Sequence, residues 1–244
     1  MKKHIKSNLL AKIFYIFHVY DKMNKKIEGE ISMRIRKKKW AENEIANSNL
    51  IINENFNNDW KNYFGNENKI CLELGCGKGK FINEMAQKFP GKNFIAVEKY
   101  FHIIAMGVRR ANNSLKNLAF IIDDISHIEK YFPKTKVSCI YINFCDPWHK
   151  KRHYKRRLTY KDFLDVYKKI LMPGAPIYFK TDNLPLFEFT LNQFSDNNWK
   201  LKNITFDLHK TNLDNVTTEY EEKFSNAGMP IYYCQAILSN DNLN

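Results

Sequence analysis

Short apolar segments alternate with amphipathic ones along most of the chain. Runs of β-branched and aromatic residues are typical of buried strands, and they occupy 70–74, 93–98, 118–122, 137–142 and 176–180. Apolar residues spaced three and four apart predict the helices between them, around 81–86, 103–110, 126–132 and 160–171. This alternation predicts an α/β fold with a doubly wound, mostly parallel sheet and helices on both faces.

The two ends of the chain extend this pattern. A helix around 187–194 and strands at 199–206 and 230–237 complete a seven-stranded sheet. Towards the N-terminus, Phe56, Trp60, Tyr63 and Phe64 recur at helical spacing, which predicts an amphipathic helix over the sheet.

Residues 1–32 differ from the rest, because they are basic and show no clear period. Either Met33 is the true initiator or these residues form a basic arm that touches RNA. We favour a dispensable or misassigned extension, followed by a single domain over 33–244 with no internal boundary.

Charge narrows the class of partner. The 244 residues carry a net charge of +13, which favours phosphate-rich partners or an anionic membrane surface. No apolar run approaches the roughly 20 residues that span a bilayer, and Lys12 and His18 interrupt the one apolar stretch near the N-terminus. The five cysteines form no C-x-x-C pair, which indicates reduced core thiols in a cytoplasmic protein and no metal site.

A glycine loop follows the first predicted strand. Gly75, Gly77 and Gly79 form a G-x-G-x-G pattern, which lets the backbone pass close to a ligand. This is not the dinucleotide pattern G-x-G-x-x-G, because position 80 is Lys. Glu73 lies inside the strand, where a carboxylate can accept from an amine or a hydroxyl.

Acidic residues end the next two predicted strands. Glu98 ends the second strand, where an acid is placed to accept both ribose hydroxyls of an adenosine. Asp123 and Asp124 end the third strand, where one carboxylate is placed to accept from an adenine amine.

The fourth predicted strand leads into the most unusual stretch. Asp146, Pro147 and Trp148 follow it, and six of the eight residues over 150–157 are Lys or Arg. Open α/β sheets place their ligands at such strand ends. A site for chemistry therefore adjoins a site for polyanions, whereas a run of this kind seen alone indicates only a solvated loop.

These segments together resemble the bacterial tRNA (guanine-N7)-methyltransferases, which use S-adenosylmethionine on a Rossmann-like fold. The resemblance rests on blocks in the family's order, from about Met33 almost to the C-terminus: 72–79, 96–98, 143–148, 150–153, 155–160, 179–183 and 218–221. One departure is His149, where the family has a second proline. The resemblance implies methyl transfer to N7 of a guanine in the variable loop of tRNA, by a cytoplasmic monomer or homodimer with no obligatory protein partner and no membrane.

The resemblance also implies roles for individual residues. Those at the cofactor are Glu73, Gly75, Gly77, Gly79, Glu98, Asp124 and Asp146, with Asp146 also catalytic. Those that touch the substrate are Lys150, Asp182, Thr218, Glu219, Tyr220 and Glu221. Those that meet tRNA are Arg152, His153, Tyr154, Lys155, Arg156 and Arg157.

Methylation at guanine N7 needs no general base. Guanine N7 carries a free lone pair, so catalysis is mostly orientation of the two reactants. We expect Asp146 and Asp182 to hold the N1 and N2 donors of the base. Trp148 either stacks on the base or anchors its loop.

Three other classes compete with this interpretation. An adenine amino-group methyltransferase has a similar Asp-Pro motif, but the basic run and residues 218–221 argue against it. An RNA-binding protein with a degenerate pocket conflicts with the intact glycines, Glu73 and Glu98. A nicotinamide dehydrogenase conflicts with the loop spacing and lacks an evident hydride-transfer site.

Overall fold

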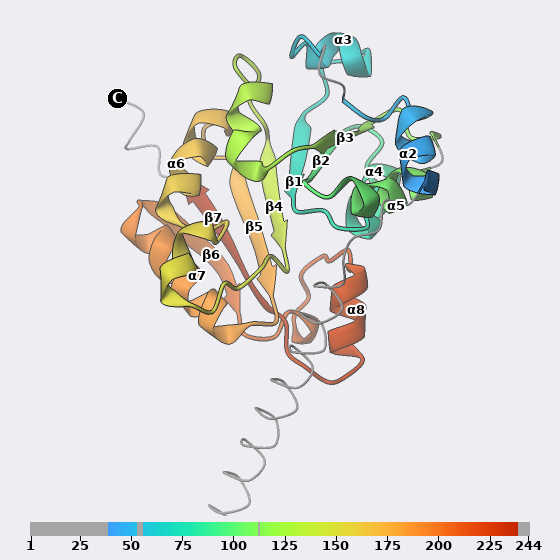
Figure 1. The fold of residues 1–244 in the computed structure, drawn as a ribbon. Helices are drawn as coiled ribbons and strands as arrows, with labels where there is room; N and C mark the ends of the chain where they lie inside the picture. The colour runs from blue at the N-terminus through green and yellow to red at the C-terminus, as the bar shows by residue number, and fades with distance from the viewer. Residues whose placement is uncertain (1–38, 53–55, 112, 239–244) are drawn as a thin grey trace, which may run out of the picture. The chain divides into compact units, whose positions relative to one another are not determined.

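The sheet has seven strands in the order β3-β2-β1-β4-β5-β7-β6. The computed structural model describes residues 39–52, 56–111 and 113–238, so the proposed extension over 1–32 lies outside the described residues. The strands are β1 (Ile70–Leu74), β2 (Asn93–Glu98), β3 (Leu118–Ile122), β4 (Cys139–Asn143), β5 (Pro176–Thr181), β6 (Trp199–Thr205) and β7 (Tyr232–Leu238). The first five are parallel, and β7 is antiparallel to both of its neighbours, β5 and β6. The predicted doubly wound, mostly parallel sheet is confirmed (Figure 1).

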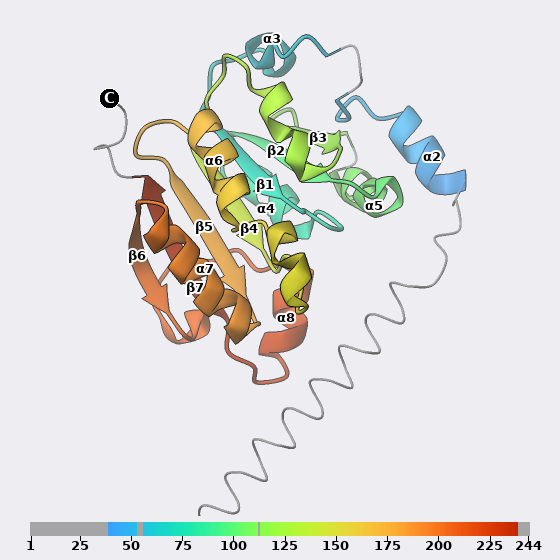
Figure 2. The same ribbon diagram turned by 60° about the vertical axis from the view of Figure 1, so that its left-hand side comes forward.

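Helices cover both faces of this sheet (Figures 1 and 2). One face carries α4 (Lys80–Lys88) and α5 (Phe101–Ala111), which bury side chains against β1, β2 and β3. The other carries η1 (Ile125–Tyr131), α6 (Lys161–Ile170) and α7 (Leu184–Asp196), packed against the larger core cluster. Strands β1 to β4 are mostly apolar and buried on both faces because helices exclude water from both, whereas the edge strand β6 is largely exposed.

Two segments near the N-terminus differ from expectation. The aromatic-rich segment forms only a short helix, α3 (Trp60–Phe64), because Asp59 caps it and Asn58 adopts a left-handed conformation at φ 64°. Its aromatic residues still pack on the sheet side, where Trp60 stacks on Phe132 at 5.4 Å between ring centroids. A helix that the pattern did not predict, α2 (Lys39–Ala46), lies against α5.

Three further elements lie near the carboxyl ends of the parallel strands. The basic run forms a 3₁₀ helix, η2 (Lys151–Arg156). Between β6 and β7, the chain forms the short 3₁₀ helix η3 (Leu208–Lys210) and then α8 (Glu219–Ser225). Within the described residues, no helix is both long and apolar enough to cross a membrane.

The glycine loop brings two helices unusually close together. A Cβ on Gly79 would lie 2.8 Å from Gly107 Cα, a separation that real Cβ atoms essentially never show. Asn83 joins the two helices here, because its Nδ2 donates to Gly79 O at 2.7 Å and to Gly107 O at 3.1 Å. Gly79 also has φ +70°, which disfavours any side chain.

We therefore expect Gly79→Ala to lower the free energy of unfolding by about 2 to 5 kcal/mol, from backbone strain plus overpacking. Gly91→Ala is the matched control, since nothing lies within 4 Å of a Cβ added there and its φ is not left-handed. Urea denaturation measures both variants. Equal stabilities would contradict the close-packing role of Gly79.

Candidate active site

The carboxyl ends of β1 to β5 meet at one edge of the sheet. The chain crosses from β3 on one side to β4 on the other, so the strand order reverses between β1 and β4. Ligands of open α/β sheets bind at such a switch point. The loops after β1 to β5 start at this edge, and predicted site residues end or follow each of these strands. Figure 2 shows the five strands side by side.

The glycine loop after β1 is anchored to β2. Gly75 N and Cys76 N both donate to Val97 O, at 2.9 and 3.1 Å. Glu98 accepts from Gly77 N at 3.2 Å and from Tyr100 N at 3.1 Å, and burial raises its pKa. A Cβ added to Gly75 or Gly77 would meet no atom within 4 Å. The loop thus faces open space that a ligand can enter.

Glu73 presents an unusual buried carboxylate beneath this loop. It is 2% exposed, and its Oε1 accepts from Asn143 Nδ2 at 3.0 Å. Its Oε2 has no hydrogen-bond partner within the described residues, and neither has Asn143 Oδ1. Burial raises the pKa of Glu73 to about 7. A buried oxygen of this kind is suited to an incoming cationic amine.

The two aspartates after β3 have different partners. Asp123 accepts from Tyr131, His127 and Lys130; burial opposes its ionisation, but these hydrogen bonds outweigh burial and hold its pKa well below the usual range. Asp124 accepts from the backbone N and the Oγ of Ser126, so it caps η1. Its side chain is 44% exposed, which leaves it accessible at the strand edge.

The loop after β4 holds Asp146 in a strained backbone. Phe144 and Trp148 have φ values of 51° and 44°, which are uncommon for residues with side chains. Phe144 N donates to Lys180 O at 2.8 Å, which fixes the loop to β5. Asp146 is exposed, and its carboxylate has no hydrogen-bond partner among the described residues; surrounding protein atoms still partly desolvate the carboxyl and raise its pKa, while Lys99 opposes this. Asp182, after β5, likewise has a pKa raised by burial.

Arg157 differs in environment from the other residues of the basic run. It is 4% exposed, and its Nε donates to Pro147 O at 2.8 Å. Its guanidinium also packs on the Tyr154 ring, 3.7 Å from the centroid. Contact of Arg157 with RNA was expected, but the structure instead places this residue under the Asp-Pro-Trp loop as a support.

The rest of the basic run is accessible. Lys150, Arg152, Lys155 and Arg156 are exposed, and His153 and Tyr154 are partly exposed. The Trp148 ring lies 4.9 Å from the Arg156 guanidinium and 5.7 Å from the His153 ring. Trp148 therefore joins its own loop to η2.

A buried ion pair secures the segment before α8. Lys180 is 4% exposed and Glu221 is 0% exposed, and Lys180 Nζ donates to Glu221 Oε2 at 2.7 Å. Lys180 Nζ also donates to Asn215 Oδ1 and to Val216 O, while His209 lies 3.1 Å from Glu221 Oε1. Contact of Glu221 with substrate was expected; the structure surrounds it with protein partners.

The neighbours of Glu221 lie closer to solvent. Thr218 and Glu221 form a capping box at the start of α8. Glu219 pairs with Arg110 and lies 3.6 Å from Lys78 of the glycine loop. The Tyr220 ring lies 5.4 Å from the Phe144 ring. Thus α8 contacts both the glycine loop and the loop that carries Asp146.

Two residues of the site were missed from the sequence, Lys180 and Asn143. Each is a polar residue at the end of an otherwise apolar strand. A lysine in such a strand indicates a buried acidic partner, because an unpaired buried charge is costly in free energy. The sequence pattern does not identify that partner.

Comparison with solved structures identifies the class of fold. The 16S rRNA methyltransferase KamB matches with a TM-score of 0.59 at 13% identity, over 77% of this chain and 95% of that one. A mutant of the 16S rRNA (adenine(1408)-N(1))-methyltransferase from Catenulisporales acidiphilia, with cosubstrate SAM, gives 0.57 at 13% identity, over 78% and 94%. At this identity the likeness shows the fold alone, which is the Rossmann-like fold of methyltransferases.

Sequence comparison identifies the family. A family model described as "Putative methyltransferase" matches residues 67–234. The tRNA (guanine-N(7)-)-methyltransferase of Brevibacillus brevis is 48% identical over 74% of this chain and 86% of its own length. Those of Halalkalibacterium halodurans and Clostridium acetobutylicum are 44% and 42% identical, each over 84% of this chain, and over 95% and 100% of their own lengths. The chain belongs to the tRNA (guanine-N7)-methyltransferase family, and the predicted resemblance is confirmed.

Glu73 makes the stability of the cofactor-free protein depend on pH. Its pKa rises from an ordinary 4.5 to about 7, so the folded state holds this proton between those values and stability is lost as pH rises through them. We expect Glu73→Gln to be more stable than the parent at pH 8, by roughly 3 kcal/mol at most. The Gln amide can donate to Asn143 Oδ1 once the Asn143 amide flips. Urea denaturation at pH 4.5 and pH 8 measures this, and an unchanged pH dependence would refute it.

The buried ion pair predicts strong coupling between Lys180 and Glu221. Removal of either partner leaves a buried charge unpaired, so Lys180→Met and Glu221→Gln should each lower the free energy of unfolding by about 3 to 5 kcal/mol. The double variant should lose clearly less than the sum of the two. A double-mutant cycle by denaturant unfolding measures the coupling, and strictly additive losses would argue against a direct pair.

Proposed function

We propose that this protein transfers a methyl group from S-adenosylmethionine to N7 of a guanine in tRNA. The observation that carries the proposal is the 42 to 48% identity to relatives named as tRNA (guanine-N(7)-)-methyltransferases. The structure supports it, because an exposed basic helix lies beside a carboxylate at the switch point. We further propose the variable loop of tRNA as the target and the cytoplasm as the compartment, with the catalytic domain over 33–244 and a monomer or homodimer as the active form.

The residues at the edge fit S-adenosylmethionine. Gly75 and Gly77 leave open space beside the loop, and the unpartnered Oε2 of Glu73 is suited to the cofactor's ammonium group. We assign Glu98 to the ribose hydroxyls, since each of its oxygens keeps further acceptor capacity, and Asp124 to the adenine amine. When bound, the cofactor supplies a methyl group attached to a positively charged sulfur. Its sulfur is a good leaving group, because it becomes a neutral thioether when the methyl group is transferred.

The protein's own part in the reaction is to hold the base. With the cofactor bound, the N7 lone pair would form the new N–C bond as the S–C bond breaks with its electron pair left on sulfur, and the guanine would become cationic. We assign the Asp146 and Asp182 carboxylates to the N1 and N2 donors, because they follow the neighbouring strands β4 and β5. Their negative charge favours the cationic product, and this orientation contributes most of the rate.

Substrate RNA meets the exposed side of the same edge. We assign phosphate contacts to Arg152, Lys155 and Arg156 of η2, together with His153 and Tyr154, and place Lys150 beside the base. Arg157 serves the site through the loop that it supports. Thr218, Glu219 and Tyr220 border the base, and Glu221 acts by holding them in place.

Transfer of labelled methyl from S-adenosylmethionine to tRNA lacking N7-methylguanosine tests the function. Nucleoside analysis should show the label in N7-methylguanosine of the variable loop. Label in methylated adenine would instead indicate the amino-group chemistry considered above.

In the same assay Asp146→Asn keeps the side-chain shape and removes the charge. We expect kcat to fall about 100-fold or more, while the Kd for tRNA stays unchanged because phosphate contacts dominate affinity. Weakened tRNA binding with normal turnover at saturation would refute the catalytic role of Asp146.

A further inference from the structure

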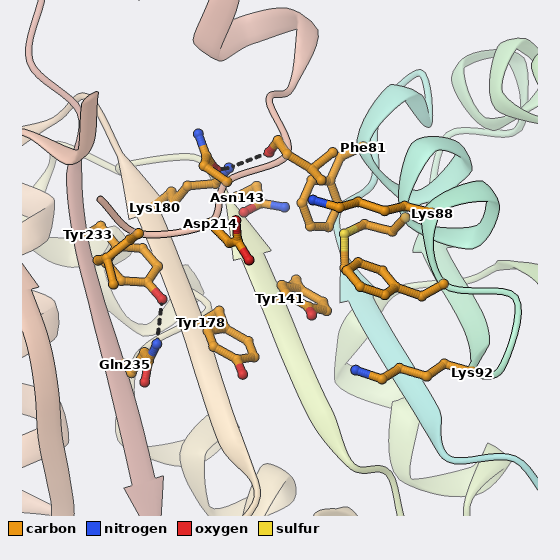
Figure 3. A pocket seen from close by; sticks show the side chains of 15 residues that line it. Phe81, Lys88, Lys92, Tyr141, Asn143, Tyr178, Lys180, Asp214, Tyr233 and Gln235 are labelled. Atoms are coloured by element: carbon orange, nitrogen blue, oxygen red, sulfur yellow. Dashed lines mark hydrogen bonds between the residues drawn. The ribbon is translucent and has the colours of Figure 1, made fainter. Parts of the chain in front are cut away.

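A cavity lies on the sheet face beside α4, outside the candidate active site (Figure 3). It has a volume of ≈ 330 Å³, which is enough for a small ligand. Strands β4, β5 and β7 supply its floor, and none of the residues assigned above to cofactor, base or phosphate lines it.

The floor of this cavity is aromatic. Tyr141 and Tyr178 are neighbours across β4 and β5, and their rings stack at 4.9 Å with an interplanar angle of 14°. Phe81 of α4 meets Tyr141 edge to face at 5.1 Å. Figure 3 shows Tyr233 beside them, and its hydroxyl accepts from Gln235 Nε2 at 2.7 Å. The rings of such a floor can contact the face of a planar ligand. The tyrosine hydroxyls and the Gln235 amide can form hydrogen bonds with the polar edge of that ligand.

The rim of the cavity is cationic. Lys88 and Lys92 lie over the Phe89 ring, with Nζ 5.4 and 5.1 Å from its centroid. Within the described residues neither forms an ion pair with a carboxylate, and both are exposed. Among the described residues that line the cavity, Asp214 is the one acidic residue, and the charge of Lys180 is balanced by Glu221. The rim is therefore suited to an anionic group.

The cavity also adjoins the catalytic edge. Asn143 and Lys180, at the ends of β4 and β5, line it, and Figure 3 shows both in its upper half. Residues 213–216 form one wall and lead directly into Thr218 at the start of α8. A polymer whose base lies at the edge can therefore continue over this wall into the cavity.

We propose that this cavity binds one unpaired nucleotide of the RNA substrate, with its base against Tyr141 and Tyr178 and its phosphate at Lys88 and Lys92. Aromatic side chains stack on splayed-out RNA bases in this way, and lysines contact the phosphates. The inference rests on the proposed RNA substrate. It adds a binding site that extends the interface from η2 around the edge of the sheet.

The first test is Lys88→Ser combined with Lys92→Ser, and separately Tyr178→Thr, which keeps a strand-forming residue. We expect each change to raise the Kd and the KM for tRNA about tenfold at unchanged kcat. The lysine variant should also lower the slope of log Kd against log salt concentration by about one. Lys116→Ser combined with Lys134→Ser is the control, since it removes the same charge from exposed lysines that do not line the cavity.

The outcome separates this inference from the proposed function. Equal loss of tRNA binding in the cavity variants and the control would overturn the inference, because only net charge would then matter. Equilibrium dialysis with labelled AMP tests a free nucleotide as the ligand: tight AMP binding that tRNA does not displace would also overturn it. If the parent protein forms no N7-methylguanosine but the cavity variants still lose RNA binding, the proposed function fails and the cavity assignment stands.

Discussion

The buried pair of Lys180 and Glu221 is the interaction on which the catalytic edge depends. Lys180 lies at the end of β5, and its carbonyl oxygen also accepts from Phe144 N in the loop that carries Asp146. Glu221 belongs to α8 and closes its capping box. One lysine therefore joins three segments that are distant in sequence. Both charges are removed from water, so loss of either partner would leave an uncompensated buried charge. The pair therefore fixes the positions of the segments that it joins at this edge.

Around this edge most of the acidic side chains lie deeper in the protein than the basic ones. The carboxylates of Glu73, Glu98 and Asp182 lie inward, where burial raises each pKa, and Asp146 lies nearer the surface of the same edge. The exposed cations of η2 lie outward. Inner acids suit a cationic cofactor and a cationic methylated base, whereas outer cations suit phosphates. The electrostatic potential is therefore negative where the cofactor and the methylated base would lie and positive where the RNA phosphates would lie. Asp146 and the cations of η2 are only a few residues apart along the chain.

The pattern of apolar residues correctly predicted elements that are defined by their own sequence, and it failed for elements whose burial depends on distant segments. The predicted bounds of β2 and β3 agree with the structure, because uninterrupted apolar runs between polar turns leave few alternatives. The aromatic spacing over 56–64 predicted a longer helix than α3. There Trp60 is buried by stacking on Phe132, which directly follows η1, so a longer helix is not needed to bury it. The helix α2 was not predicted, since its burial depends on α5.

The sequence by itself determined the sheet, the glycine loop and the strand ends at which Glu98, Asp124, Asp146 and Asp182 lie, because strand periodicity and loop chemistry act between near neighbours. It also determined the family, through blocks of residues in a fixed order. Only the tertiary structure decided which charged residues are buried and with what partners. Arg157 and Glu221 read as exposed ligands of RNA and base, yet each is desolvated by residues far along the chain. Desolvation depends on every segment that packs around a group, and a linear pattern does not contain that information.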